Sequence, residues 1–199
     1  MFAVEGEDLV DAGLAAGLEP EELLVVGENV SAELLASVST LPHPARRIAV
    51  FRRADLPSGA RPTGVALWRV GDPGNLGAIL RTADALGPAF VALSEGCADP
   101  TGPKAVRASM GALFRVPLVP FDDAPGRRVA LVAHGGGPLH EVDLSGDVTF
   151  VLGSEREGLP ADVAASCDAQ ATIPVEPGTE SLNVAAAAAL ALYERRRRG

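Results

Sequence analysis

Five polar side chains stand out because they lie beside apolar runs that are interrupted by glycine or proline. Asn75 and Arg81 lie in "DPGNLGAILRTADALG", Glu155 lies in "LGSEREGLP", and Ser181 and Asn183 follow "IPVEPGTE". A guanidinium can hold a phosphate, a carboxylate can bind a basic group or steady a loop, and glycine lets a backbone approach a ligand closely. The pattern therefore predicts a ligand site in which Arg81 lies near a phosphate.

Three of these residues also have a purely structural interpretation. Asn75 suits the cap at the start of a helix, and Arg81 would then face solvent. Glu155 suits a strand-to-helix turn with a solvated carboxylate. The spacing alone leaves both interpretations open. The glycines at 135–137 do not make a nicotinamide-binding fingerprint, because no helix with a third glycine follows them.

The elements that would position these residues alternate along the chain. Helix-like segments cover residues 75–87, 104–113 and 183–198. Such alternation predicts an α/β fold with a mostly parallel sheet flanked by helices. Ligands of such sheets bind in the loops after the carboxyl ends of the strands. The apolar runs expected as strands are residues 65–70, 90–94, 116–121, 129–134, 148–153 and 169–175.

Residues 1–55 are expected to form a small α/β domain of their own. Ser31 is a plausible cap for a helix over the segment that follows it. Residues 56–64 concentrate proline, glycine and serine and are the best linker candidate. The main domain is then expected over residues 65–199. The expected strands of the small domain include residues 23–26 and 47–51.

Charge and cysteine usage limit the possible functions. The 199 residues carry a net charge of −9, which argues against strong non-specific binding to nucleic acid. Arginines nevertheless gather locally, and those at 195–198 are either a solvated helix end favoured by the helix dipole or an RNA contact. Cys97 and Cys167 lie far apart, so neither a zinc site nor a disulfide framework is suggested. With no targeting or membrane-spanning segment, we expect a soluble, cytoplasmic protein without a metal.

Three stretches together resemble the signature motifs of the SpoU/TrmH family of RNA ribose 2′-O-methyltransferases, within the SPOUT superfamily. They are "NLGAILRTADALG", "FVLGSEREGLP" and "IPVEPGTESLNVAAAAALALYE", in the family's order and at similar separation. The resemblance runs from about Val65 to the C-terminus. It implies a C-terminal deep trefoil knot, a rare exception to the rule against knotted chains. It also implies S-adenosyl-L-methionine as cofactor, tRNA or rRNA as substrate, and a homodimer.

The resemblance also implies roles for individual residues. Arg81 would bind the target nucleotide and activate its 2′-OH, with Asn75, Glu155 and Asn183 in supporting catalytic roles. The small side chains of the alanine-rich helix would let the knotted chain pass. The expected cofactor-binding residues are Ala133, Leu152, Gly153, Gly158, Ile173, Ser181, Leu182 and Asn183.

The first 55 residues are similar, more loosely, to the substrate-binding domain of longer family members, which is related to a ribosomal protein that binds kinked RNA. The best-matching piece is "FAVEGEDLVDAG". The basic helix that usually precedes this piece is not in the sequence. We therefore expect an RNA substrate-binding-like domain here.

Two other functions remain open at this point. The chain could be a non-catalytic RNA-binding protein that keeps the knotted fold, which the acidic composition does not exclude. It could also be a different α/β enzyme or nucleotide-binding module, which would make three motif matches a coincidence. The presence of Asn75, Arg81, Glu155 and Asn183 together favours the methyltransferase.

Overall fold

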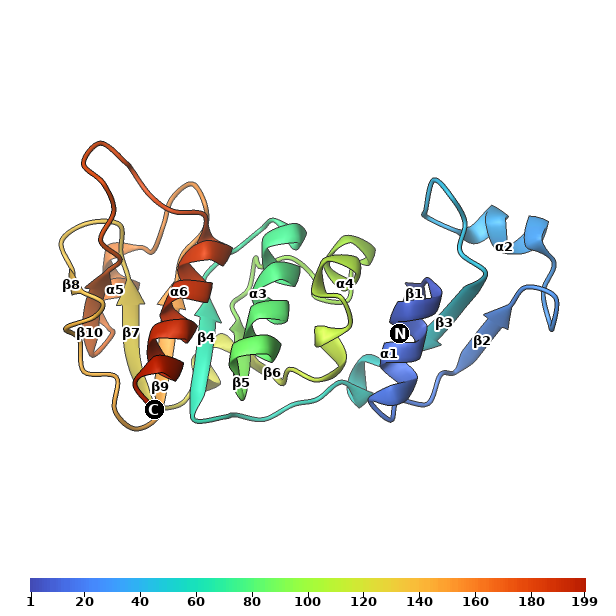
Figure 1. The fold of residues 1–199 in the computed structure, drawn as a ribbon, viewed down its shortest axis with the longest axis horizontal. Coiled ribbons are helices and arrows are strands. Elements are labelled where there is room, and N and C mark those ends of the chain that lie inside the picture. Colours follow the sequence, from blue (N-terminus) through green and yellow to red (C-terminus); the bar gives the residue numbers. More distant parts are fainter.

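The computed structural model describes residues 1–199, which form two sheets joined by residues 56–62 (Figure 1). A three-stranded antiparallel sheet lies near the N-terminus, and a seven-stranded parallel sheet is built from the rest of the chain. None of the helices has the length and apolar content needed to cross a lipid bilayer. The expected α/β fold with a mostly parallel, helix-flanked sheet is confirmed.

The N-terminal unit, residues 1–55, alternates strands and helices. Its strand order is β1-β3-β2, and a short 3-10 helix follows at Arg53–Asp55. Ser31 caps α2, because its side chain accepts a hydrogen bond from the Leu34 N–H at 3.2 Å, as the sequence predicted. The elements are β1 (Phe2–Glu5), α1 (Glu7–Ala15), β2 (Glu22–Val25), α2 (Ala32–Val38) and β3 (Arg47–Phe51).

The parallel sheet has the strand order β6-β5-β4-β9-β7-β10-β8. The six strands expected from apolar runs are present, although β4 begins two residues earlier than expected and β7 ends at Leu131. Strand β8, two residues of the glycine-rich segment, has no apolar signal and forms by pairing with β10. The strands are β4 (Thr63–Leu67), β5 (Ala89–Leu93), β6 (Leu118–Pro120), β7 (Arg127–Leu131), β8 (Gly137–Pro138), β9 (Val148–Leu152) and β10 (Ala169–Thr172).

Helices cover both faces of this sheet, as Figure 1 shows. On one face, core residues of α3, α4 and α6 share one hydrophobic cluster with Val65 and Leu67 of β4, while Ala66 belongs to the smaller core beneath α5 on the other face. The expected helix over 104–113 breaks near Met110 and continues as the 3-10 helix Ala112–Phe114. The helices are α3 (Pro73–Leu86), α4 (Pro103–Ser109), α5 (Ala161–Ala165) and α6 (Val184–Arg197), with a further 3-10 turn at Phe121–Asp123.

The start of α3 differs from the sequence interpretation. Asp72, not Asn75, is the cap, because its Oδ1 accepts a hydrogen bond from the Asn75 N–H at 2.8 Å. Pro73 occupies the first helical position, where its missing N–H costs nothing. Asn75 therefore lies in the first turn, and its side-chain amide is free for other contacts.

The arginines at the end of α6 anchor that helix. Arg195 donates to the Gly146 carbonyl, Arg196 donates to the Gly87 carbonyl, and Arg198 donates to the carbonyls of Val142 and Leu139 at 2.6 and 2.9 Å. Hydrogen bonds from Arg197 and Arg198 lower the pKa of Glu194 to about 2. Most of this cluster is thus committed to contacts within the chain, which favours the structural interpretation over RNA contact.

The N-terminal unit packs against the parallel-sheet unit through an aromatic cluster. The rings of Phe2, Phe51 and Phe114 lie 5.6 to 6.4 Å apart, and Phe114 comes from the segment after α4. Arg53 adds a bidentate ion pair to Asp99 at 3.0 and 2.6 Å. Burial raises the pKa of Asp99, but hydrogen bonds from Arg53 and Thr101 outweigh burial and leave that pKa below its usual value.

Candidate functional site

A cavity of about 420 Å³ opens at the carboxyl edge of the parallel sheet. Three segments wall it: the end of β7 with residues 132–133, the end of β9 with residues 153–158, and the segment from Ile173 to the first turn of α6. These loops follow neighbouring strands of the sheet, which is where ligands of such folds bind. Its volume is within the range of small-molecule sites.

All eight residues predicted to bind the cofactor line this cavity. They come from segments up to fifty residues apart in the chain, so the fold brings together what the motifs indicated separately. Their function as cofactor ligands stays a prediction. The eight residues are Ala133, Leu152, Gly153, Gly158, Ile173, Ser181, Leu182 and Asn183.

Hydrogen bonds through the side chain of Asn75 join the three motifs. Its Nδ2 donates to Glu155 Oε1 at 2.7 Å, and its Oδ1 accepts from Asn183 Nδ2 at 3.0 Å. Asn183 in turn caps α6, since its Oδ1 accepts from the N–H groups of Ala185 and Ala186 at 2.9 and 3.3 Å. Three of the four predicted catalytic residues are therefore in direct contact.

Arg81, the fourth, is not part of this network. It is exposed on α3, makes no hydrogen bond or ion pair within the chain, and does not line the cavity. It lies six positions after Asn75, so at about 100° per residue the two side chains point about 120° apart around the helix. The structure therefore separates Arg81 from the other predicted catalytic residues of the same chain.

Gly153 is required by the path of the backbone. A Cβ at this position would overlap the backbone of Gly158 and Leu159, and Gly158 itself has a φ of 66°. The Gly158 N–H closes the loop by donating to the Ser154 carbonyl at 3.0 Å. Any side chain at 153 would disrupt the loop itself, so a substitution there cannot test ligand binding separately from folding.

The opposite wall offers unused backbone groups. The N–H and C=O groups of Ile173, Ser181 and Leu182 make no hydrogen bond within the chain. They stand beside apolar side chains, including those of Leu131 and Leu152. A part of the cavity that combines apolar side chains with free backbone donors and acceptors suits a flat heteroaromatic ring, because the ring can be sandwiched and hydrogen-bonded at its edge.

Sequence reasoning missed four charged residues at or beside this site. Arg156, Glu157 and Glu180 line the cavity, and Lys104 holds the start of α3 by pairing with Asp72 at 3.0 Å. Hydrogen bonds from the Asn75 N–H and Lys104 lower the pKa of Asp72. Arg156 and Glu157 could have been predicted from their position in the loop after β9, whereas nothing in the sequence indicates the contact of Lys104 with Asp72.

Comparison with known proteins agrees with this site. The model of the SpoU rRNA Methylase family matches residues 62–193, which span the parallel sheet, the cavity and most of α6. The chain belongs to this family. Its site is therefore formed by the segment that defines the family.

Two curated relatives illustrate the similarity. The chain is 36% identical to an uncharacterized tRNA/rRNA methyltransferase of Synechocystis over 84% of its own length, and 30% identical to the 23S rRNA (guanosine(2553)-2′-O)-methyltransferase RlmP of Bacillus subtilis over 98%. It covers 88% of RlmP but less than two thirds of the first curated relatives, 66% of the Synechocystis protein and 63% of one from Mycobacterium tuberculosis.

Solved structures resemble the whole chain. An RNA methyltransferase of the TrmH family from Porphyromonas gingivalis, described as putative, superposes with a TM-score of 0.88 at 33% identity, covering 100% of this chain and 90% of the other. The AdoMet-bound rRNA methyltransferase from Sinorhizobium meliloti superposes with a TM-score of 0.86 at 30% identity, covering 99% and 87%. The similarity thus includes the N-terminal unit.

Asn183→Ala should destabilise the protein, because α6 loses its capping oxygen and Asn75 loses a donor. We expect a loss of about 1 kcal/mol, or a fall in Tm of about 2 to 4 °C, measured by thermal denaturation. Asn183→Ser is the matched control, since serine restores a capping oxygen and should recover most of the loss. Equal Tm values for the two variants would contradict the capping role.

Proposed function

We propose that the chain is an S-adenosyl-L-methionine-dependent RNA methyltransferase that methylates a ribose 2′-OH of tRNA or rRNA. The observation that carries this proposal is the cavity at which the three motifs meet through Asn75. The names of the relatives support the reaction, since two of them are 23S rRNA 2′-O-methyltransferases. Modification of tRNA or rRNA would place the enzyme in the cytoplasm.

The cavity residues fit S-adenosyl-L-methionine. Ile173 and Leu182 would enclose the adenine between their side chains and bond its edge through their free backbone groups. Three carboxylates at the cavity, those of Glu155, Glu157 and Glu180, outnumber the single cation of Arg156 and suit a positively charged ligand. When bound, the cofactor supplies a methyl group on a cationic sulfur.

The residues around the cavity would position the ribose. Ribose methylation needs the 2′-oxygen in line with the methyl group, so orientation supplies much of the rate. We assign Arg81 to the phosphate beside the target ribose, where it would also stabilise negative charge developing on the 2′-oxygen. A guanidinium has a pKa above about 12 and is a poor proton acceptor. Glu155 and Asn183, fixed by Asn75, would orient the site.

We further propose that the C-terminal segment is threaded to form the trefoil knot. The segment 173–183 returns from β10 to the cavity wall, opposite the loop 153–158. Beyond it, α6 packs against α3 and ends among the carbonyls of the segment 139–146. Alanines at positions 188 and 191 of α6 are fully buried, which supports a helix selected for close packing.

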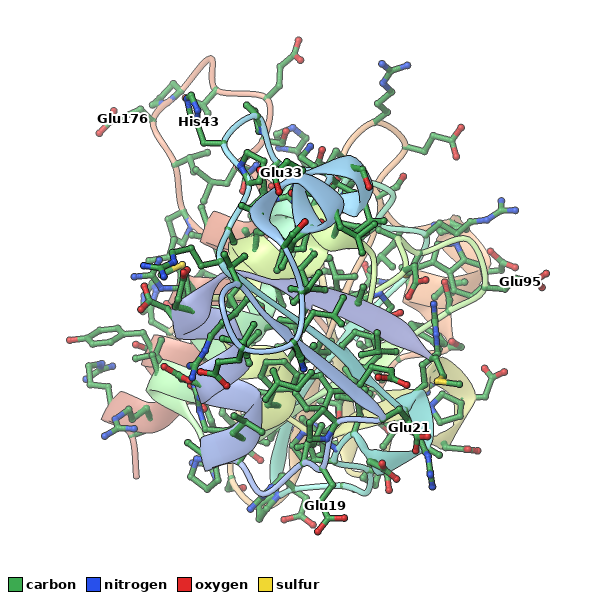
Figure 2. The ribbon with its side chains drawn as sticks, turned by 90° about the vertical axis from the view of Figure 1, so that its right-hand side faces the viewer. Glu19, Glu21, Glu33, His43, Glu95 and Glu176 are labelled. Atoms are coloured by element: carbon green, nitrogen blue, oxygen red, sulfur yellow. The ribbon has the colours of Figure 1, made fainter.

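We also propose that residues 1–55 act as an RNA-contacting domain, with 56–64 as linker and 65–199 as the methyltransferase domain. Figure 2 shows His43 and Glu176 on the same side of the molecule, and Figure 1 shows that the segments that carry them lie toward opposite ends of its long axis. His43 belongs to the loop before β3, and Glu176 to the segment that walls the cavity. An RNA that lies along this side of the molecule could contact both the N-terminal unit and the cavity mouth.

A homodimer would explain the position of Arg81. The side chain has no partner within its own chain, and the exposed side chains of Leu190 and Tyr193 form an apolar stripe on α6, which packs beside α3. We propose that this surface pairs two subunits and brings Arg81 of the partner subunit to the site. Light scattering should give the mass of two chains of 20.4 kDa each, and a monomer at working concentration would contradict the proposal.

Leu182→Arg should abolish binding of S-adenosyl-L-methionine, because a long charged side chain would fill the adenine side of the cavity. Isothermal titration calorimetry on folded protein should show micromolar binding by the wild type and none by the variant. Leu14→Arg is the matched control, since Leu14 is 38% exposed against 37% for Leu182 and lies on α1, away from the cavity. Equal affinities for all three proteins would contradict this assignment of the cavity.

Arg81→Ala should lower methyl transfer to RNA by about 100- to 1000-fold while leaving cofactor affinity unchanged. Transfer from a labelled methyl donor to bulk tRNA and rRNA measures the activity, and calorimetry measures the cofactor affinity. Arg61→Ala, which changes another exposed arginine without an ion pair, should retain activity. Loss of cofactor binding in Arg81→Ala would show that the residue is structural. RNA and cofactor binding by the wild type without methyl transfer would favour the non-catalytic alternative.

A further inference from the structure

Arg69 has a backbone conformation that suits glycine. It follows β4 at the carboxyl edge of the parallel sheet, and its φ is 53°. Residues with a Cβ disfavour this left-handed region for steric reasons, and glycine adopts it freely. Met110 is the other non-glycine residue with a positive φ. The fold alone therefore gives no reason for arginine at position 69.

Hydrogen bonds on both sides hold Arg69 in this conformation. The Trp68 N–H donates to the Leu152 carbonyl at 2.8 Å, and the Ala98 N–H donates to the Val70 carbonyl at 2.9 Å. The Arg69 N–H itself donates to Ser94 Oγ at 2.9 Å. The segment is thereby fixed between β9 and the loop that follows β5.

The side chain of Arg69 is directed by its packing. It lies over Gly96, where an added Cβ would come within 3.3 Å of its Nε. Its guanidinium makes no hydrogen bond or ion pair, not even with neighbouring Glu95, which points outward at the edge of the molecule in Figure 2. Arg69 thus presents a free cation on a side chain whose stem is held by the protein.

This cation stands beside the candidate site but outside the cavity. The contact between Trp68 and Leu152 places the Arg69 segment next to the strand that leads to Glu155. Three residues beyond Arg69, Asp72 caps the helix that carries Asn75. In a chain with a net charge of −9, an unpaired arginine at this edge suits a phosphate that approaches the cavity mouth.

We propose that Arg69 contacts a backbone phosphate of the substrate RNA and orients the strand that enters the site. This inference rests on the proposed function, because it presupposes an RNA substrate. It explains why the position holds an arginine in a conformation that glycine would adopt without cost. Arg69 would act on RNA binding and leave cofactor binding unchanged.

The test compares Arg69→Gln and Arg69→Gly with Arg61→Gln. Arg61 is the matched control, because it is exposed, has no ion pair and lies two residues before β4, whereas Arg69 lies two residues after it. Fluorescence anisotropy with a labelled single-stranded oligouridylate of about twenty nucleotides, between about 50 and 200 mM KCl, gives Kd and its salt dependence. Bulk bacterial tRNA serves as a competitor.

Both Arg69 variants should raise Kd for RNA about three- to tenfold and reduce the slope of log Kd against log salt by about 0.7, the value for one phosphate contact on a single strand. Arg61→Gln should remain within about twofold of the wild type. Arg69→Gly should keep or raise Tm by up to about 3 °C, because glycine relieves the left-handed backbone. A purely structural role would lower Tm in Arg69→Gly and leave the salt slope unchanged.

Each alternative outcome has a separate meaning. Wild-type protein that methylates RNA, with Arg69→Gln matching Arg61→Gln in RNA affinity, would overturn the Arg69 contact and leave the proposed function standing. Weaker binding of S-adenosyl-L-methionine by Arg69→Gln, with RNA affinity intact, would also overturn it. Wild-type protein that neither binds nor methylates RNA would overturn both proposals.

Discussion

The side-chain amide of Asn75 is the contact on which the arrangement of the site depends. It donates to Glu155 and accepts from Asn183, which are 80 and 108 residues away in the chain. An amide provides a donor and an acceptor on one short side chain, whereas a carboxylate or an alkyl group cannot provide both. Because Asp72 caps α3, Asn75 is released for this task. Both the loop after β9 and the start of α6, which line the cavity, are positioned through it.

The elements of the parallel sheet could be predicted because burial on both faces leaves strong marks in the sequence. Runs such as residues 148–153 are apolar at every side chain or nearly so, and glycine and proline separate them from helical segments. The cavity residues were predictable for a different reason. They occupy short motifs whose order and spacing resemble a known family, and the sheet topology then brings the motif ends to one edge.

What could not be predicted depends on contacts between distant residues. The ion pair of Lys104 with Asp72 and the hydrogen bond of Asn75 to Glu155 join residues that are 32 and 80 positions apart in the chain. The short strand at Gly137–Pro138 exists only because β10 lies beside it. The arginines of α6 resembled a solvated or RNA-binding cluster, and only the tertiary fold supplies the backbone carbonyls that they bind.

The interface between the N-terminal unit and the parallel-sheet unit has a consequence for the proposed selection of substrate. The packed rings of Phe2, Phe51 and Phe114 and the ion pair of Arg53 with Asp99 hold the N-terminal unit against the parallel-sheet unit. The distance between the loop before β3 and the cavity mouth is therefore determined by the packing of the two units. The protein would thus present two RNA contact points at a fixed separation. Under the proposed function, an RNA that contacts both points would be selected by the distance between the element bound at the N-terminal unit and its target ribose, so three-dimensional shape would select the substrate even where base identity does not.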